Sequence, residues 1–166
     1  DPLVGIQHEV PVRRRDIQDI FEMRLLLEPQ AARLAAGRID AQLARTLDNA
    51  GGTAYQPQDA RSIERFLEAN KDFHVGIAAS TGNRRLAAMV AQLHDQMTRL
   101  LHLGLGLRNR SQEMQGEHRA LLKALTRGDG DAAERLAREQ IEAARAMVLS
   151  AVMTSRSVMN LALGAD

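Results

Sequence analysis

The sequence predicts an all-α protein, an antiparallel bundle of about six to seven helices with a central ligand cavity. Apolar residues recur every three or four positions along most of the 166 residues, and no stretch alternates as a half-buried strand would. Turn-forming residues separate these periodic stretches by only a few positions. Such short connections make neighbouring helices antiparallel. The cavity is expected because polar side chains interrupt the apolar faces of four helices.

The first helix is expected to begin near Asp16, which is a good N-cap, and to carry its apolar stripe to about Gly37. Pro29 lies inside this stretch and should kink the helix or split it in two. Residues 1–15 show no stable periodicity and end in three arginines. We interpret them as a linker or arm.

The later helices are bounded by capping and turn residues. Asp40 can cap a short second helix, and a loop with two glycines and Pro57 follows it. A break at 81–83 precedes a long helix with leucines at seven-residue spacing, which we assign to the core in preference to a dimer seam. The turn 127–130 separates the last two helices. The expected ranges are about 40–49, 59–80, a long helix after 83, 111–126 and 131–155, with a tail at 156–166.

Composition narrows the class of protein. A chain of 166 residues is about one domain by the usual length prior. The net charge is +1 with acids and bases interspersed, so these residues alone are a poor candidate for binding DNA. The absence of cysteine excludes disulfides and thiolate zinc sites and fits the cytoplasm. No apolar run approaches the roughly 20 residues of a membrane span.

Five polar side chains lie at helical spacing among apolar neighbours: Arg24, Asn70, His74, His118 and Gln140. Positions four apart lie above each other on a helix, so Asn70 and His74 share one face. A buried imidazole or amide without a partner costs roughly 1 to 3 kcal/mol, and an unpaired guanidinium costs more. One shared polar pocket would satisfy all five.

The residue types suggest what such a pocket binds. Inward histidines beside an asparagine can ligate zinc-like ions, although a lone inward histidine is more often a core residue bonded to backbone or water. An inward guanidinium matches a planar carboxylate. The alternative for Arg24 is an internal salt bridge, for example with Glu28 or Glu22.

A competing catalytic interpretation uses His94-Asp95. With His74 and a later Asp129 or Asp131, this dipeptide resembles the ligand set of helical HD-type phosphohydrolases. On a helix, however, His94 and Asp95 point about 100° apart. We expect this pair to be exposed.

Several segments, in this order, carry a family resemblance. They are DIQDIFEMR at 16–24, LEP at 27–29, NKDFH at 70–74, ASTGN at 79–83, EH at 117–118, AL at 124–125 and GD at 128–129. The chain resembles the FCD domain, the C-terminal effector-binding domain of the FadR subfamily of GntR transcriptional regulators. The match extends over about residues 16 to 150.

The resemblance implies an all-helical bundle whose cavity binds a small carboxylate, often beside a divalent metal held by an Asp or Asn and three histidines. The corresponding positions are Asn70, His74, His118 and Gln140, so this chain has glutamine where the third histidine is usual. We therefore expect a weak divalent site of the zinc or nickel class, or none. The four side chains would then hydrogen-bond the ligand directly, and Arg24 would hold its carboxylate.

The resemblance also implies a homodimer that binds operator DNA through an N-terminal winged helix preceding residues 1–15. Residues 16–155 would be the sensing and dimerisation domain, and the effector would alter operator affinity. We therefore expect a non-enzymatic sensor of a small organic acid in a bacterial regulator. The alternatives are a metal-dependent HD-like phosphohydrolase using His74, His94 and Asp95, and a helical interaction module without a ligand.

Overall fold

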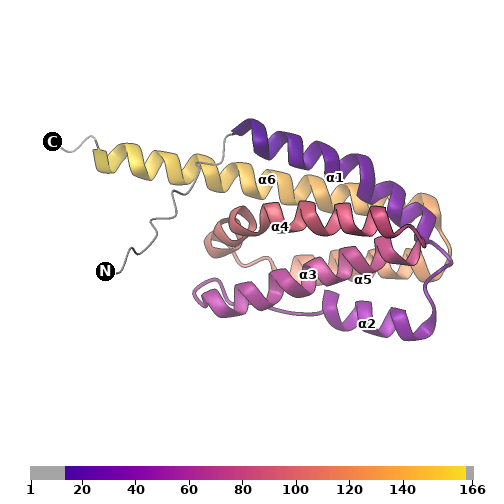
Figure 1. The fold of residues 1–166 in the computed structure, drawn as a ribbon. Helices are drawn as coiled ribbons and strands as arrows, with labels where there is room; N and C mark the ends of the chain where they lie inside the picture. Colours follow the sequence, from indigo (N-terminus) through magenta and orange to yellow (C-terminus); the bar gives the residue numbers. More distant parts are fainter. Residues whose placement is uncertain (1–13, 164–166) are drawn as a thin grey trace, which may run out of the picture.

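The computed structural model describes residues 14–163, with side chains described as far as residue 155, and confirms the all-α prediction. α1 packs along α6, α3 packs against α4, and α2 covers the outer side of α3 and α5 (Figure 1). None of the described helices is long and apolar enough to span a bilayer. The described helices are α1 (Arg14–Ala35), α2 (Ala41–Gly51), α3 (Ala60–Ser80), α4 (Arg84–Leu107), α5 (Ser111–Thr126) and α6 (Gly130–Leu163).

The boundaries of α1 differ from those expected. The helix begins at Arg14, so Asp16 lies in its first turn, where a carboxylate favours the helix dipole, instead of capping it. Pro29 does not split the helix, which continues to Ala35. Packing explains this, because Pro29 and most of the inward residues that flank it are buried. Of the expected linker, 14 and 15 are helical and 1–13 lie outside the described residues.

Three predicted helix starts are confirmed by their capping bonds. Asp40 Oδ1 accepts a hydrogen bond from the third residue after it at 2.8 Å. Asp59 caps α3 and Asn83 caps α4 in the same way. Each side chain thus satisfies backbone N–H groups that the first turn of a helix leaves without a partner.

α6 is longer than predicted. It continues past 155 to Leu163, so most of the expected tail at 156–166 is helical. The sequence explains the length, because no glycine or proline occurs between Asp131 and Leu163. In Figure 1 the last part of α6 extends beyond the ends of the neighbouring helices.

The spaced leucines of α4 are core residues only in the middle of the helix. Leu93 and Leu100 are buried, Leu86 is partly buried and Leu107 is 56% exposed. Most of the buried apolar side chains form two clusters, one around Phe21 and Met97 and the other around Phe73 and Leu125.

Candidate functional site

A layer of polar side chains separates the two apolar clusters. On α3, Leu67 belongs to one cluster and Phe73 to the other, and Asn70 lies between them. On α1, α5 and α6, too, buried polar residues lie between residues of one cluster and residues of the other. The polar residues of the layer are Arg24, Glu28, Asn70, His74, His94, His118 and Gln140.

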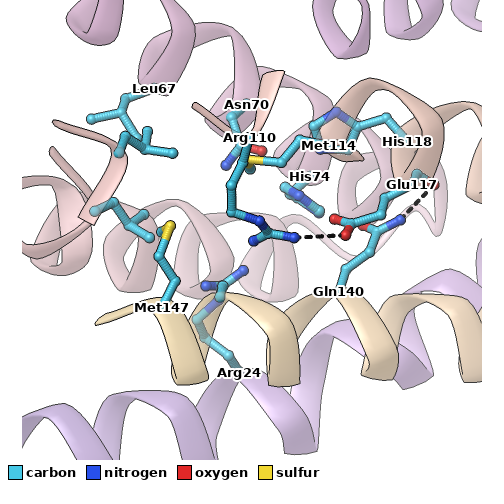
Figure 2. Close-up of a pocket in the computed structure, with 13 residues that line it drawn as sticks. Arg24, Leu67, Asn70, His74, Arg110, Met114, Glu117, His118, Gln140 and Met147 are labelled. Carbon is cyan, nitrogen blue, oxygen red and sulfur yellow. Dashed lines mark hydrogen bonds and ion pairs between the residues drawn. The ribbon is translucent and has the colours of Figure 1, made fainter. Parts of the chain in front are cut away.

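All five residues singled out in the sequence line one cavity in this layer, together with Arg110 and Glu117 (Figure 2). The cavity has a volume of about 20 Å³. That is room for roughly one water molecule. A larger ligand must therefore move some of the lining side chains, of which Met114 and Met147 are the most adaptable.

Arg24 forms an internal salt bridge with Glu28, which was the alternative prediction for this residue. Its Nε and Nη2 donate to the two Glu28 carboxylate oxygens at 2.7 and 3.2 Å, and both side chains are buried. Burial pushes the pKa of Glu28 upward, but Arg24 and the nearby His94 and His74 hold that pKa well below its ordinary value. Because a guanidinium stays charged in proteins, Glu28 is ionised.

His94 is not exposed as the sequence interpretation expected. It is only 3% exposed, and its Nε2 lies 3.1 Å from Glu28 Oε1. Asp95 points outward to Lys71, so the two residues do not form the joint ligand pair of the phosphohydrolase alternative. The sequence held a signal, because His94 shares a helix face with Val90, Met97 and Leu101, all buried.

His74 lies at the centre of a group of rings. Its ring stacks on His94 with centroids 5.0 Å apart and meets His118 edge-on at 5.5 Å. Burial lowers the pKa of His74 well below its ordinary value, although the Glu28 carboxylate opposes this. Burial also lowers the pKa of His94, and it lowers that of His118 to about 4. At neutral pH these imidazoles are therefore uncharged.

Acceptor atoms collect in the cavity. His118 Nδ1 lies 3.1 Å from the Gly51 carbonyl, so Nδ1 carries the hydrogen and Nε2 is left as an acceptor. Gln140 donates to the Glu117 carbonyl at 2.7 Å, while its Oε1 has no partner. Asn70 Oδ1 is likewise buried without a partner. Each such orphan costs about 1 to 3 kcal/mol, so the cavity favours a ligand that donates hydrogen bonds or a cation.

Arg110 is a cavity residue that the sequence interpretation missed. Its Nη2 donates to Glu117 at 2.8 Å and its Nε to Glu113 at 3.0 Å. The hydroxyl of buried Tyr55 accepts from the Arg110 backbone N–H at 2.8 Å and donates to the Arg108 carbonyl at 2.9 Å. Arg110 lies just before the first residue of α5, so helical periodicity could not predict where its side chain points. Glu117, the carboxylate that Arg110 contacts, has a pKa that burial raises.

The FCD domain family matches residues 19–143, about three quarters of the chain. The chain belongs to the FCD domain family. No curated protein matches the sequence significantly.

Two solved structures are similar to this FCD domain. E. coli McbR/YncC superimposes with a TM-score of 0.71 at 22% identity, covering 84% of this chain and 66% of that protein. Streptococcus agalactiae GntR superimposes with a TM-score of 0.62 at 25% identity, covering 81% and 61% respectively. The first likeness concerns the fold alone. The chain spans less than two thirds of the length of either protein.

The residues at the metal positions implied by the FCD resemblance fit a divalent ion poorly. Asn70, His74, His118 and Gln140 offer two imidazoles and two neutral amide oxygens, and no carboxylate. The unpartnered oxygens of Asn70 and Gln140 could accept a cation, and the His118 bond to Gly51 is the kind of contact that orients a metal-binding imidazole. Without an anionic ligand, however, affinity for a divalent ion is low.

Proposed function

We propose that this FCD domain is the effector-sensing domain of a GntR-family transcriptional regulator and that its cavity binds a small organic acid. The proposal rests on one observation. Two buried guanidinium groups, from Arg24 and Arg110, line a single cavity in which each is neutralised by a carboxylate of the protein itself. Such an arrangement can exchange an internal carboxylate for one that belongs to a ligand.

Glu117 is the internal carboxylate that leaves most easily. Its side chain is 30% exposed, against 6% for Glu28, and burial raises its pKa, so it is the less tightly held of the two. When Glu117 turns outward, Arg110 is free to bind a ligand carboxylate. Figure 2 shows Arg110 between Glu117 and Arg24, so both guanidinium groups can reach one bound acid.

The orphan oxygens supply specificity for the rest of the ligand. Asn70 Oδ1 and Gln140 Oε1 need hydrogen-bond donors, and the acceptor nitrogen of His118 can accept a further one. A hydroxyl or amino group next to the ligand carboxylate supplies them. A site that offers buried acceptors rejects an analogue lacking the donor, since the acceptors would stay unpaired.

A divalent ion of the zinc or nickel class at Asn70, His74 and His118, with Gln140 beside them, is not needed for this proposal, because that set has no anionic ligand. The side chains themselves orient the acid and shield it from water.

In the intact regulator, we propose that residues 16–155 sense the acid and form a homodimer, and that a winged-helix domain preceding residues 1–15 reads operator DNA in the cytoplasm. The likeness to S. agalactiae GntR, which is longer than this chain, supports this assignment. A coupling free energy of about 1 to 3 kcal/mol between acid and operator would suffice for regulation. No enzymatic step is part of the proposal.

Calorimetric titration of the chain with lactate, malate, citrate and benzoate tests the proposal. We expect one or more acids to bind the wild type, and Arg24→Gln or Arg110→Gln to weaken that acid at least tenfold, because each removes a charged hydrogen-bond donor. Arg135→Gln, an exposed arginine on α6 paired with Glu139, is the control and should bind as the wild type does. Binding that both cavity variants leave unchanged would refute the proposed site.

A further inference from the structure

Three potential metal ligands meet where α1, α3 and α4 come together. Glu28, His74 and His94 each offer one ligand atom, and these atoms lie within 4.8 Å of one another. Glu28 Oε1 is 3.1 Å from His94 Nε2, and Glu28 Oε2 is 3.7 Å from His74 Nδ1. All three side chains are 9% exposed or less. In a tetrahedral site with bonds of about 2.1 Å, ligand atoms are roughly 3.4 Å apart, so ligand atoms that now lie within 4.8 Å of one another must draw closer on binding.

We propose that Glu28, His74 and His94 form a binding site for a divalent ion of the zinc class. Two imidazoles and a carboxylate suit such an ion better than the set that includes Asn70 and Gln140, because they provide an anionic ligand. A fourth position would stay open for water or a ligand. The new site shares only His74 with the set implied by the family resemblance.

The protonation states support the assignment. A metal ion binds neutral imidazole and ionised carboxylate. Burial lowers the pKa of both His74 and His94, while Arg24 keeps the pKa of Glu28 low against the effect of burial. The hydrogen that His94 Nε2 donates to the ionised Glu28 carboxylate must move to Nδ1 before Nε2 can ligate the ion, so binding at neutral pH requires a change of tautomer but no net loss of a proton.

Arg24 competes with the ion. Its guanidinium donates to both oxygens of Glu28, and one or both of these bonds must loosen when Glu28 ligates a metal. The freed guanidinium also lines the cavity, where it would meet the carboxylate of the acid. Ion and acid should therefore strengthen each other's binding, a consequence that rests on the proposed function. Metal binding by the cluster does not rest on it.

Titration of the untagged chain with Co²⁺ and Zn²⁺, in the absence of any acid, tests the site. We expect the visible spectrum of Co²⁺ to change on binding to wild type, and His94→Gln to weaken the affinity by about 100-fold or more, as loss of a ligand should. His118→Gln should weaken binding much less than His94→Gln does, because His118 only meets the His74 ring edge-on. His102→Gln is the matched control, since His102 is on the same helix outside the cluster.

The Arg24→Gln variant should change the affinity for Co²⁺ in the opposite direction. Because it removes the competitor for Glu28, we expect Co²⁺ to bind about tenfold more tightly, with a correspondingly larger rise of the melting temperature on adding Zn²⁺. Circular dichroism of each variant verifies the helix content, and the melting shift is still informative if a variant is destabilised.

Three outcomes would overturn the site. The first is that the wild type does not bind Co²⁺ at millimolar concentration. The second is that His94→Gln binds Co²⁺ with the affinity of the wild type. The third is that His118→Gln no longer binds Co²⁺ while His94→Gln still does. The last outcome would place the ion on the set with Asn70. None of these results depends on whether the cavity binds an acid, so failure of the metal site and failure of the proposed function are distinguishable.

Discussion

Glu28→Gln removes the charge that neutralises Arg24 and leaves the shape of the side chain nearly unchanged. Arg24 is 3% exposed, so in the variant its guanidinium is a buried cation that has lost its counter-ion. Breaking a buried pair in this way costs about 3 to 5 kcal/mol. For a domain of this size, each kcal/mol lowers the melting temperature by about 2 to 4 °C, so the fall should be roughly 10 °C.

The chain contains a matched control for this experiment. Arg135 and Glu139 have the same four-residue spacing and a bond of 3.0 Å, but their side chains are 62% and 59% exposed. Glu139→Gln should therefore lower the free energy of unfolding by less than about 0.5 kcal/mol. Urea unfolding followed by circular dichroism, with chelator present, measures both variants.

The double variant Arg24→Met with Glu28→Gln separates the cost of an unpaired charge from the value of the pair. We expect it to regain much of the stability that Glu28→Gln loses, since neither residue then carries a buried charge. If Glu28→Gln is no more destabilised than Glu139→Gln, Arg24 is not held as a buried cation and the electrostatic description of the cavity is wrong.

Three further changes probe the remaining parts of the site. Tyr55→Phe should cost about 1 to 3 kcal/mol in urea unfolding and weaken acid binding, because it leaves the buried Arg110 N–H without its acceptor. His118 alone should account for a loss of about 3 kcal/mol in the free energy of unfolding as pH falls from 6.5 to about 4, its pKa, since the unfolded chain takes up the proton first, and His74 and His94 should add to this loss. In His118→Gln the pH dependence of unfolding should be shallower over that window, and an identical slope would exclude His118 as its source. Gly51→Ala should lower the melting temperature, because its Cβ would lie 2.9 Å from that of His118, whereas Gly116→Ala, with open space around it, should be neutral or stabilising.

Helix starts and the inward polar residues could be predicted from sequence for local reasons. The side chains of Asp40, Asp59 and Asn83 bond to backbone groups two or three positions away, so the capping pattern is contained in a short segment. Asn70 and Gln140 were found because their helical neighbours are apolar, and both line the cavity.

The misses depend on contacts between helices. His94 was predicted to be exposed because it lies beside the leucine stripe of α4. However, α4 packs against α1, α3 and α6, so the buried face of α4 is wider than this stripe and includes His94. Arg110 precedes a helix, and only its bonds to Glu117 and Tyr55 fix its direction. The position of Arg110 could not be obtained from the periodicity of one helix, whereas the apolar neighbours of His94 at helical spacing were a signal that the prediction did not use.

Native mass spectrometry of the purified chain, before and after chelation, tests the central proposal most directly, because it detects a bound small molecule and counts subunits at once. We expect wild type to retain an organic acid, alone or after incubation with the panel, and the double variant Arg24→Gln with Arg110→Gln to retain none. A wild-type chain that carries no acid under either condition, or a double variant that still carries it, would contradict the assignment of this cavity as an acid sensor.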